Sequence, residues 1–336
     1  METASKCVKD FIDSSSDVCH KNVSLFETVV LKVFRHQYSS CEPYRRYLGY
    51  IGTDPDSVTS IETIPFLPVQ FFKSEDIYSG NSMPEKVFTS SATTGMEPSH
   101  HPVSDISLYE SSFLNGFRIF YGDPVDYVIL ALLPSYLERE GSSLVYMADK
   151  LIRMTGSSES GFYLNNRREL FNKITSLRKS NKKVILLGVS FALLDFANEY
   201  KIEFPELIVM ETGGMKGRGK EIERDELHKI LKNCFGVENI HSEYGMAELL
   251  SQAYSSGDGV FQTPPWMEIL IRDLNNPFRI AGTGKRGGIN IIDLANVNSC
   301  SFIETEDMGI KTAGNGFKIL GRIKNSELRG CNLLLG

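Results

Sequence analysis

A run of hydroxyl side chains fills residues 89–100, which read Thr-Ser-Ser-Ala-Thr-Thr-Gly-Met-Glu-Pro-Ser-His. Hydroxyls and free backbone N–H groups donate hydrogen bonds to phosphate oxygens, and small residues let the backbone approach a polyphosphate closely. The candidate phosphate-binding residues are Ser90, Ser91, Thr93, Thr94 and Gly95. A solvated turn has the same composition, so the loop alone leaves both interpretations open.

A second group of chemically capable residues lies at 243–248, with the sequence Glu-Tyr-Gly-Met-Ala-Glu. The ring of Tyr244 can stack on a base, Gly245 lets a nucleotide approach the backbone, and the carboxylate of Glu248 can hold a hard cation such as Mg²⁺. The string is short, so its interpretation depends on what surrounds it. A pair of glycines, Gly213 and Gly214, follows an apolar run nearby.

The six cysteines form no CxxC pair and no His/Cys cluster with zinc spacing. We expect reduced thiols, most of them small residues of the core. Cys331 is the exception, because it lies five residues before the end of the sequence with Arg329 and Lys324 near it. Neighbouring cations lower a thiol pKa and favour the nucleophilic thiolate. The alternative is that the leucines at 333–335 pack the tail down and bury Cys331 as a structural residue.

Apolar runs alternate with amphipathic segments through the middle of the chain. Runs at 127–133, 184–187 and 207–210 predict strands that are buried on both faces, and shorter strand-like segments lie at 86–88 and 238–241. Helical patterns occupy 109–120, 142–154, 191–200 and 221–234. The alternation predicts an α/β fold with a mostly parallel sheet covered by helices. Ligands of such sheets lie beyond the carboxyl ends of the strands, where Gly213 and Tyr244 are expected.

The pattern of apolar, proline and glycine residues divides the chain into four segments. Residues 1–63 predict a helical N-terminal cap, and 64–255 an α/β nucleotide-binding core that opens with an extended, buried connection at 64–73. Strand-like segments at 266–273 and 288–293, separated by a glycine-rich turn, predict a small β-rich subdomain over 256–320, antiparallel or barrel-like. A tail with Cys331 occupies 321–336.

Composition narrows the class of protein. The 336 residues are 41% hydrophobic and 23% charged, typical of a globular protein with a large core. The net charge of −6 argues against a general binder of nucleic acid or acidic membranes. No apolar run approaches the roughly 20 residues that span a bilayer, and the first residues lack a signal-peptide core. A cytoplasmic location is expected.

The order of these motifs resembles the adenylate-forming superfamily of acyl and aryl ligases. The hydroxyl-rich loop is followed by the Tyr-Gly string, the glycine-rich turn, Thr305-Glu306-Asp307 and Gly321-Arg322. The stretch at 211–218, the short length and a cysteine near the C-terminus are most similar to the acyl-protein synthetase family of bacterial luminescence, the long-chain-fatty-acid–protein ligases. The resemblance covers about 64 to the end. It implies an adenylate-forming ligase-like N-terminal domain, with the large C-terminal mobile domain absent.

The resemblance also implies roles for particular residues. Tyr244 would lie on the adenine of ATP with Gly213, Gly214 and Gly245 around it, and the hydroxyl-rich loop would hold the phosphates. Glu248 would bind Mg²⁺. The ribose would be held by Asp307, an acceptor for its hydroxyls, with Arg322 beside the ribose or phosphate; the alternatives are a turn residue and a surface ion pair. The candidate catalytic residues are Cys331, Glu248 and Thr93.

The implied reaction uses ATP and Mg²⁺ in two steps. A carboxylic acid, fatty in the family, becomes an acyl-adenylate, and the acyl group then forms a thioester on Cys331 for delivery to a partner acyl reductase. Two alternatives stay open. The acceptor can be coenzyme A or a carrier-protein thiol. The chain can also be a non-catalytic binding subunit, since Ala92 replaces a usual glycine and no lysine follows Pro98. The identity of the acid is open.

Overall fold

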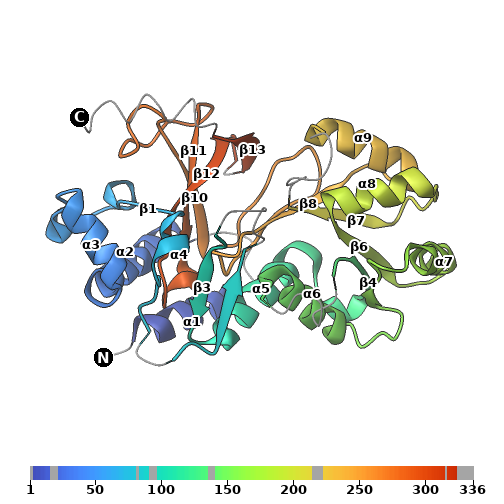
Figure 1. Cartoon of the computed structure of the whole chain (residues 1–336), viewed down its shortest axis with the longest axis horizontal. Helices are drawn as coiled ribbons and strands as arrows, with labels where there is room; N and C mark the ends of the chain where they lie inside the picture. Colours follow the sequence, from blue (N-terminus) through green and yellow to red (C-terminus); the bar gives the residue numbers. More distant parts are fainter. Residues whose placement is uncertain are drawn as a thin grey trace.

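A computed structural model describes residues 3–15, 22–80, 83–90, 97–134, 141–213, 222–314 and 316–323. In these ranges, two sheets and a hairpin are surrounded by helices (Figure 1). The hairpin pairs β2 (Lys86–Thr89) with β3 (His100–Val103) and therefore brackets the hydroxyl-rich loop.

The larger sheet has six strands in the order β5-β4-β6-β7-β8-β9. Their bounds are β4 Tyr127–Leu132, β5 Gly161–Phe162, β6 Lys183–Val189, β7 Ile208–Thr212, β8 His241–Tyr244 and β9 Ala253–Ser255. All neighbours are parallel except β8 and β9. Along β4, Leu130 enters one core and Ile129 the other, so both faces are buried. The predicted parallel sheet with buried strands is confirmed.

Helices cover both faces of this sheet (Figure 1). On one face lie α5 (Ile106–Tyr121) and α6 (Ser143–Met154), which share a core with alternate residues of the strands. The other face carries α7 (Arg167–Leu177), α8 (Ser190–Glu199) and α9 (Arg224–Phe235). Because β6, β7 and β8 are parallel neighbours, their carboxyl ends lie at the same edge of the sheet.

The smaller sheet has five strands. They are β1 Leu67–Pro68, β10 Met267–Arg272, β11 Arg286–Asp293, β12 Phe302–Lys311 and β13 Phe317–Arg322. The order is β1-β12-β11-β10, with β13 also paired to β12; β1 is parallel to β12 and the other pairs are antiparallel. The sheet is open over the described residues. The alternative of a barrel-like subdomain is therefore wrong, and the predicted antiparallel arrangement is confirmed for β10 to β13.

The N-terminal helices lie beside this smaller sheet (Figure 1). They are α1 Ala4–Ser14, α2 Val23–Ser40 and α3 Glu42–Tyr50, followed by the 3-10 helices η1 Pro55–Ser57 and η2 Ile61–Thr63; η3 Pro124–Asp126 and η4 Leu294–Asn296 lie further on. Of these helices, α2 and α3 pack on the sheet and α1 packs against α2 and α5. The rings of Phe34 and Tyr44 contact Phe302 of β12 at 6.1 and 6.0 Å between centroids. The division of the chain into four segments stays a prediction.

Two local expectations are wrong. The segment expected to be extended through Lys73 ends in a short helix, α4 (Phe71–Ser74), because both prolines precede it and neither blocks a helix that begins after Pro68. The strand expected at 238–241 instead runs from His241 to Tyr244, because only these residues pair with β7 and β9. Among the described helices, none combines the length and apolar character needed to cross a bilayer.

Candidate functional site

The two sheets meet at a hydrogen bond between two of the predicted nucleotide residues. The hydroxyl of Tyr244, at the end of β8, donates to Oδ2 of Asp307 on β12 at 2.8 Å. The ring of Tyr244 is almost buried and contacts Phe261 and Phe317 at 6.1 and 6.0 Å between centroids. Burial, and then the Asp307 carboxylate, raise the pKa of Tyr244 well above its ordinary value, so the phenol stays a donor.

Arg322 lies beside this contact. It faces Asp307 across β12 and β13, with Nε 3.9 Å from Oδ1 of Asp307 and Nη1 3.7 Å from Oε2 of Glu306. Its side chain is 61% exposed, and exposed ion pairs contribute little to stability. The guanidinium is therefore a surface ion pair that remains accessible to a ligand bound near Asp307.

The end of β7 forms the next part of the edge. Gly213 has φ +67, a conformation that favours glycine, and its carbonyl accepts a hydrogen bond from Ser190 Oγ at 2.8 Å. Ser190 Oγ also lies 2.8 Å from Oε2 of buried Glu211, whose Oε1 is 3.3 Å from Arg224 Nε. Gly214 lies outside the described residues. Gly213 is thus held by Ser190, whose hydroxyl also contacts the buried carboxylate of Glu211.

Glu211 remains charged despite its burial. Burial alone would raise its pKa, but His228, Arg224 and the Ser190 hydroxyl together hold the pKa below its ordinary value. His228 Nε2 lies 3.6 Å from Oε1, which is an ion-pair distance and too long for a hydrogen bond.

The loop after β8 carries Glu248 and is held through its backbone. Asn296 Nδ2 donates to the carbonyl of Glu248 at 2.8 Å, and the N–H groups of Leu250 and Ser251 donate to Oδ2 of Asp293 at 2.9 Å each. Burial raises the pKa of Asp293 to about 6 despite these donors. These bonds hold the backbone of the loop, while the buried Glu248 carboxylate makes no hydrogen bond or ion pair with the described residues.

A free carboxylate at a fixed position fits a magnesium ion. Mg²⁺ is usually held by one or two carboxylates together with water and substrate phosphates rather than by a protein cage. Among the described residues, no group of three or more His, Cys, Asp or Glu side chains could hold a metal ion. Glu248 offers a single carboxylate ligand of this kind.

The hydroxyl-rich loop is described only at its ends. The N–H of Ser90 donates to the carbonyl of Ser99 at 3.1 Å, and Ser90 Oγ accepts from the N–H of Ser99 at 2.9 Å. Ser91, Thr93, Thr94 and Gly95 lie outside the described residues. These two hydrogen bonds hold the ends of the loop together, directly after β2 and before β3.

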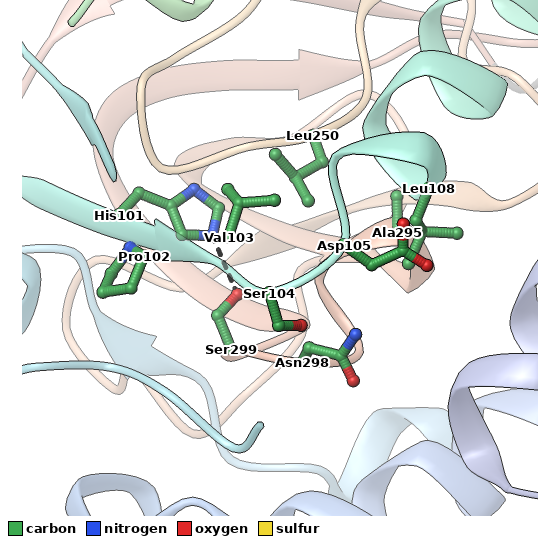
Figure 2. Close-up of a pocket in the computed structure, with 10 residues that line it drawn as sticks. All are labelled: His101, Pro102, Val103, Ser104, Asp105, Leu108, Leu250, Ala295, Asn298 and Ser299. Atoms are coloured by element: carbon green, nitrogen blue, oxygen red, sulfur yellow. Dashed lines mark hydrogen bonds between the residues drawn. The ribbon is translucent and has the colours of Figure 1, made fainter. Parts of the chain in front are cut away.

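A histidine that the sequence analysis passed over joins this hairpin to the Glu248 loop. His101 Nδ1 lies 2.9 Å from the carbonyl of Ala247, and Nε2 lies 2.9 Å from Ser299 Oγ at the edge of a small cavity (Figure 2). Burial lowers the pKa of His101 to about 4, so the ring is neutral and donates to Ala247 through Nδ1. A lone histidine has no spacing signal, which is why the sequence did not reveal it.

Arg272 is a second residue that was missed. Its buried guanidinium donates to the carbonyls of Ile289 at 3.0 Å and Thr305 at 2.8 Å, which fixes β12 two residues before Asp307. A Cβ on Gly288 would lie 2.2 Å from Cζ of Arg272. The last residue of the glycine-rich turn must therefore be a glycine, because Gly288 makes room for the Arg272 side chain rather than for a ligand.

The structure thus brings Tyr244, Asp307 and Arg322 together and places Gly213 at the end of the strand next to β8. Gly245 follows Tyr244 directly, and a Cβ there would lie 2.5 Å from Glu243 Oε1. Cys331 lies outside the described residues. The arrangement offers an aromatic ring, an acceptor for hydroxyls, an accessible cation and a free carboxylate around one edge.

Comparisons with known proteins identify the family of this chain. The sequence model of the family described as "Acyl-protein synthetase, LuxE" matches residues 3–106 and 142–336. A relative from Photorhabdus luminescens, named long-chain-fatty-acid–luciferin-component ligase, is 36% identical over 99 residues, which are 28% of this chain and 84% of the relative.

Solved structures share the fold. A 2-hydroxyisobutyryl-CoA ligase in the postadenylation state superposes with a TM-score of 0.67 at 14% identity, covering 90% of this chain and 69% of the ligase. ATP-bound MatB from Rhodopseudomonas palustris gives a TM-score of 0.51 at 16% identity, covering 70% and 47%.

Proposed function

Because the chain belongs to the acyl-protein synthetase (LuxE) family, whose members are acid–thiol ligases, we propose that it uses ATP to activate a carboxylic acid and passes the acyl group to a thiol. The mixed α/β fold is that of adenylate-forming ligases. The observation that carries the proposal is the Tyr244–Asp307 hydrogen bond, which puts an aromatic face and a hydroxyl-binding carboxylate side by side.

The nucleotide would bind at this contact. Its adenine lies on Tyr244 near Gly213 and Gly214, its ribose hydroxyls donate to Asp307, and Arg322 approaches the ribose or phosphate. The phosphates lie against the hydroxyl-rich loop, whose candidate donors are Ser90, Ser91, Thr93, Thr94 and Gly95. Glu248 would hold Mg²⁺, which neutralises negative charge on the phosphates when bound.

The first step activates the acid. A carboxylate oxygen attacks the α-phosphorus of ATP, the bond from that phosphorus to the bridging oxygen of the β-phosphate breaks, and pyrophosphate leaves. Donors that are fixed before the reaction stabilise the developing charge better than mobile water, and the hairpin and the Glu248 loop are fixed by Ser90, His101 and Asp293.

In the second step a thiolate attacks the acyl carbon, a C–S bond forms, and the C–O bond to AMP breaks. Burial raises the pKa of Cys41 and Cys234 to about 11 and that of Cys300 well above its ordinary value, which argues against these three as nucleophiles. We assign the acceptor to Cys331, which has Arg329 near it in sequence. The thioester would then be delivered to an acyl reductase.

Intact-protein mass spectrometry tests both steps. The full chain is incubated with MgATP and carboxylic acids of increasing length, and wild type is compared with Cys331→Ser and with the matched control Cys7→Ser. We expect a hydroxylamine-labile acyl adduct on wild type and on the control, and none on Cys331→Ser. Pyrophosphate release without an adduct would transfer the acceptor role to an external thiol. Absence of ATP binding would instead favour a non-catalytic subunit.

A further inference from the structure

Buried polar side chains line the face of β7, β8 and β9 that packs toward α5. Thr212, Glu243 and Tyr254 are successive register partners across these strands. The hydroxyl of Thr212 donates to Oε2 of Glu243. Gln252 lies next to them, since a Cβ on Gly245 would be 2.5 Å from Glu243 Oε1 and 3.5 Å from Gln252 Cγ. The absent side chain of Gly245 is what allows these two groups to approach the strand end.

Two members of this cluster lack partners. The hydroxyl of Tyr254 and Oε1 of Gln252 are buried and have no hydrogen-bond partner among the residues that the structure describes. Their residues are only 3% and 5% exposed. An unpaired buried polar atom is costly and requires an explanation, such as a bound molecule. Burial also raises the pKa of Glu243 to about 7, which adds a third hydrogen-bonding group near neutral pH.

The position of the cluster indicates which molecule it meets. Successive residues of a strand point to opposite faces, so Tyr244 and Glu243 face opposite sides of β8. Phe261 and Phe317 meet the Tyr244 ring edge-on, so the Tyr244 side is taken up by these aromatic rings and by the nucleotide proposed above. An acid whose carboxylate reaches a nucleotide on Tyr244 therefore extends past Gly245 on the Glu243 side. This step depends on the function proposed above.

We propose that Glu243, Gln252 and Tyr254 bind a hydroxyl group of the acid, so that the substrate is a carboxylic acid with a hydroxyl within a few carbons of its carboxyl group. A hydroxyl both donates and accepts, so it satisfies Oε1 of Gln252 and the hydroxyl of Tyr254 together. A plain fatty acid would leave both atoms unpaired. The three residues act on specificity through direct contact with the acid.

Acid-dependent ATP–pyrophosphate exchange by the full chain tests this inference with matched acids. The pairs are 3-hydroxybutyrate with butyrate and 3-hydroxydodecanoate with dodecanoate, and 3-aminobutyrate is added. We expect wild type to prefer one or both hydroxy acids by about tenfold or more in kcat/KM, because loss of one buried hydrogen bond has a cost of about this size. Tyr254→Phe and Gln252→Met should reduce the preference to about threefold or less without changing the KM for ATP.

Tyr121→Phe is the matched control. Its hydroxyl is already paired with His241 at 3.1 Å, so its loss should leave the preference unchanged. Equal rates for hydroxylated and plain acids, or a preference for the amino acid, would overturn the substrate class while leaving adenylation intact. A loss in Tyr254→Phe that is equal for both acids and accompanied by a lower Tm would overturn it too, as a structural effect. Failure of exchange with every acid would overturn the proposed function and the inference together.

Discussion

We expect the Tyr244→Phe variant to lose about 1 kcal/mol of unfolding free energy while retaining ATP binding. A hydrogen bond to a charged group contributes about 1.5–3 kcal/mol when it is buried, but the Asp307 side chain is 17% exposed and water can replace part of the lost contact. The phenylalanine ring still packs on Phe261 and Phe317 and still offers a face to adenine. The Kd for ATP should therefore change by no more than about threefold.

Asp307→Ala should behave differently. It removes the same hydrogen bond and also the acceptor for the ribose hydroxyls, so the Kd for ATP should rise about tenfold to a hundredfold. Urea unfolding of wild type, both single variants and the double variant gives the coupling energy of the pair, and calorimetric titration gives the four Kd values. The coupling should be about 1 kcal/mol.

Two results would refute this reasoning. A coupling energy below about 0.3 kcal/mol would mean that the two side chains act independently. An equal loss of ATP affinity in Tyr244→Phe and Asp307→Ala would mean that the phenol, rather than the carboxylate, holds the nucleotide.

Three further predictions concern the supports of the site. Because the folded pKa of Glu243 is raised to about 7, its contribution to stability is present below about pH 4.5 and is lost as the pH rises to 7; urea unfolding of Glu243→Gln should lack this part of the pH dependence. His101→Leu leaves the Ala247 carbonyl unpaired and should lower the unfolding free energy by about 2 kcal/mol and raise the Mg²⁺ concentration for half-maximal exchange. Gly288→Ala should destabilise by about 3 kcal/mol in thermal unfolding, whereas Gly282→Ala, with open space around its Cβ, should not.

The larger sheet could be predicted from local patterns. Its strands are buried on both faces, so each one is a continuous apolar run that can be recognised without knowing which strand pairs with it. The strand at 127–133 and the helix at 142–154 are accordingly close to β4 and α6. The pairing of β1 with β12 had no such signal, since two residues carry no period and their partners lie more than 200 positions away. Tyr244 and Asp307 were each named from motif order, but their contact depends on how two sheets pack and is not encoded in either motif.

The groups that position Glu248 carry no local sequence signal either. Its loop is held by His101 from the hairpin and by Asp293 and Asn296 from the end of β11 and η4, so two segments distant from the loop in sequence fix the backbone around Glu248. Apart from the Ser251 hydroxyl, which also donates to Asp293, these contacts end on backbone atoms of the loop, and a backbone partner places no requirement on the side chain of its residue. A sequence motif therefore identifies Glu248, the residue that would bind a metal ion. Only the packed structure identifies the residues that determine where that ion would lie, and these are the positions at which substitutions should change stability and metal dependence together.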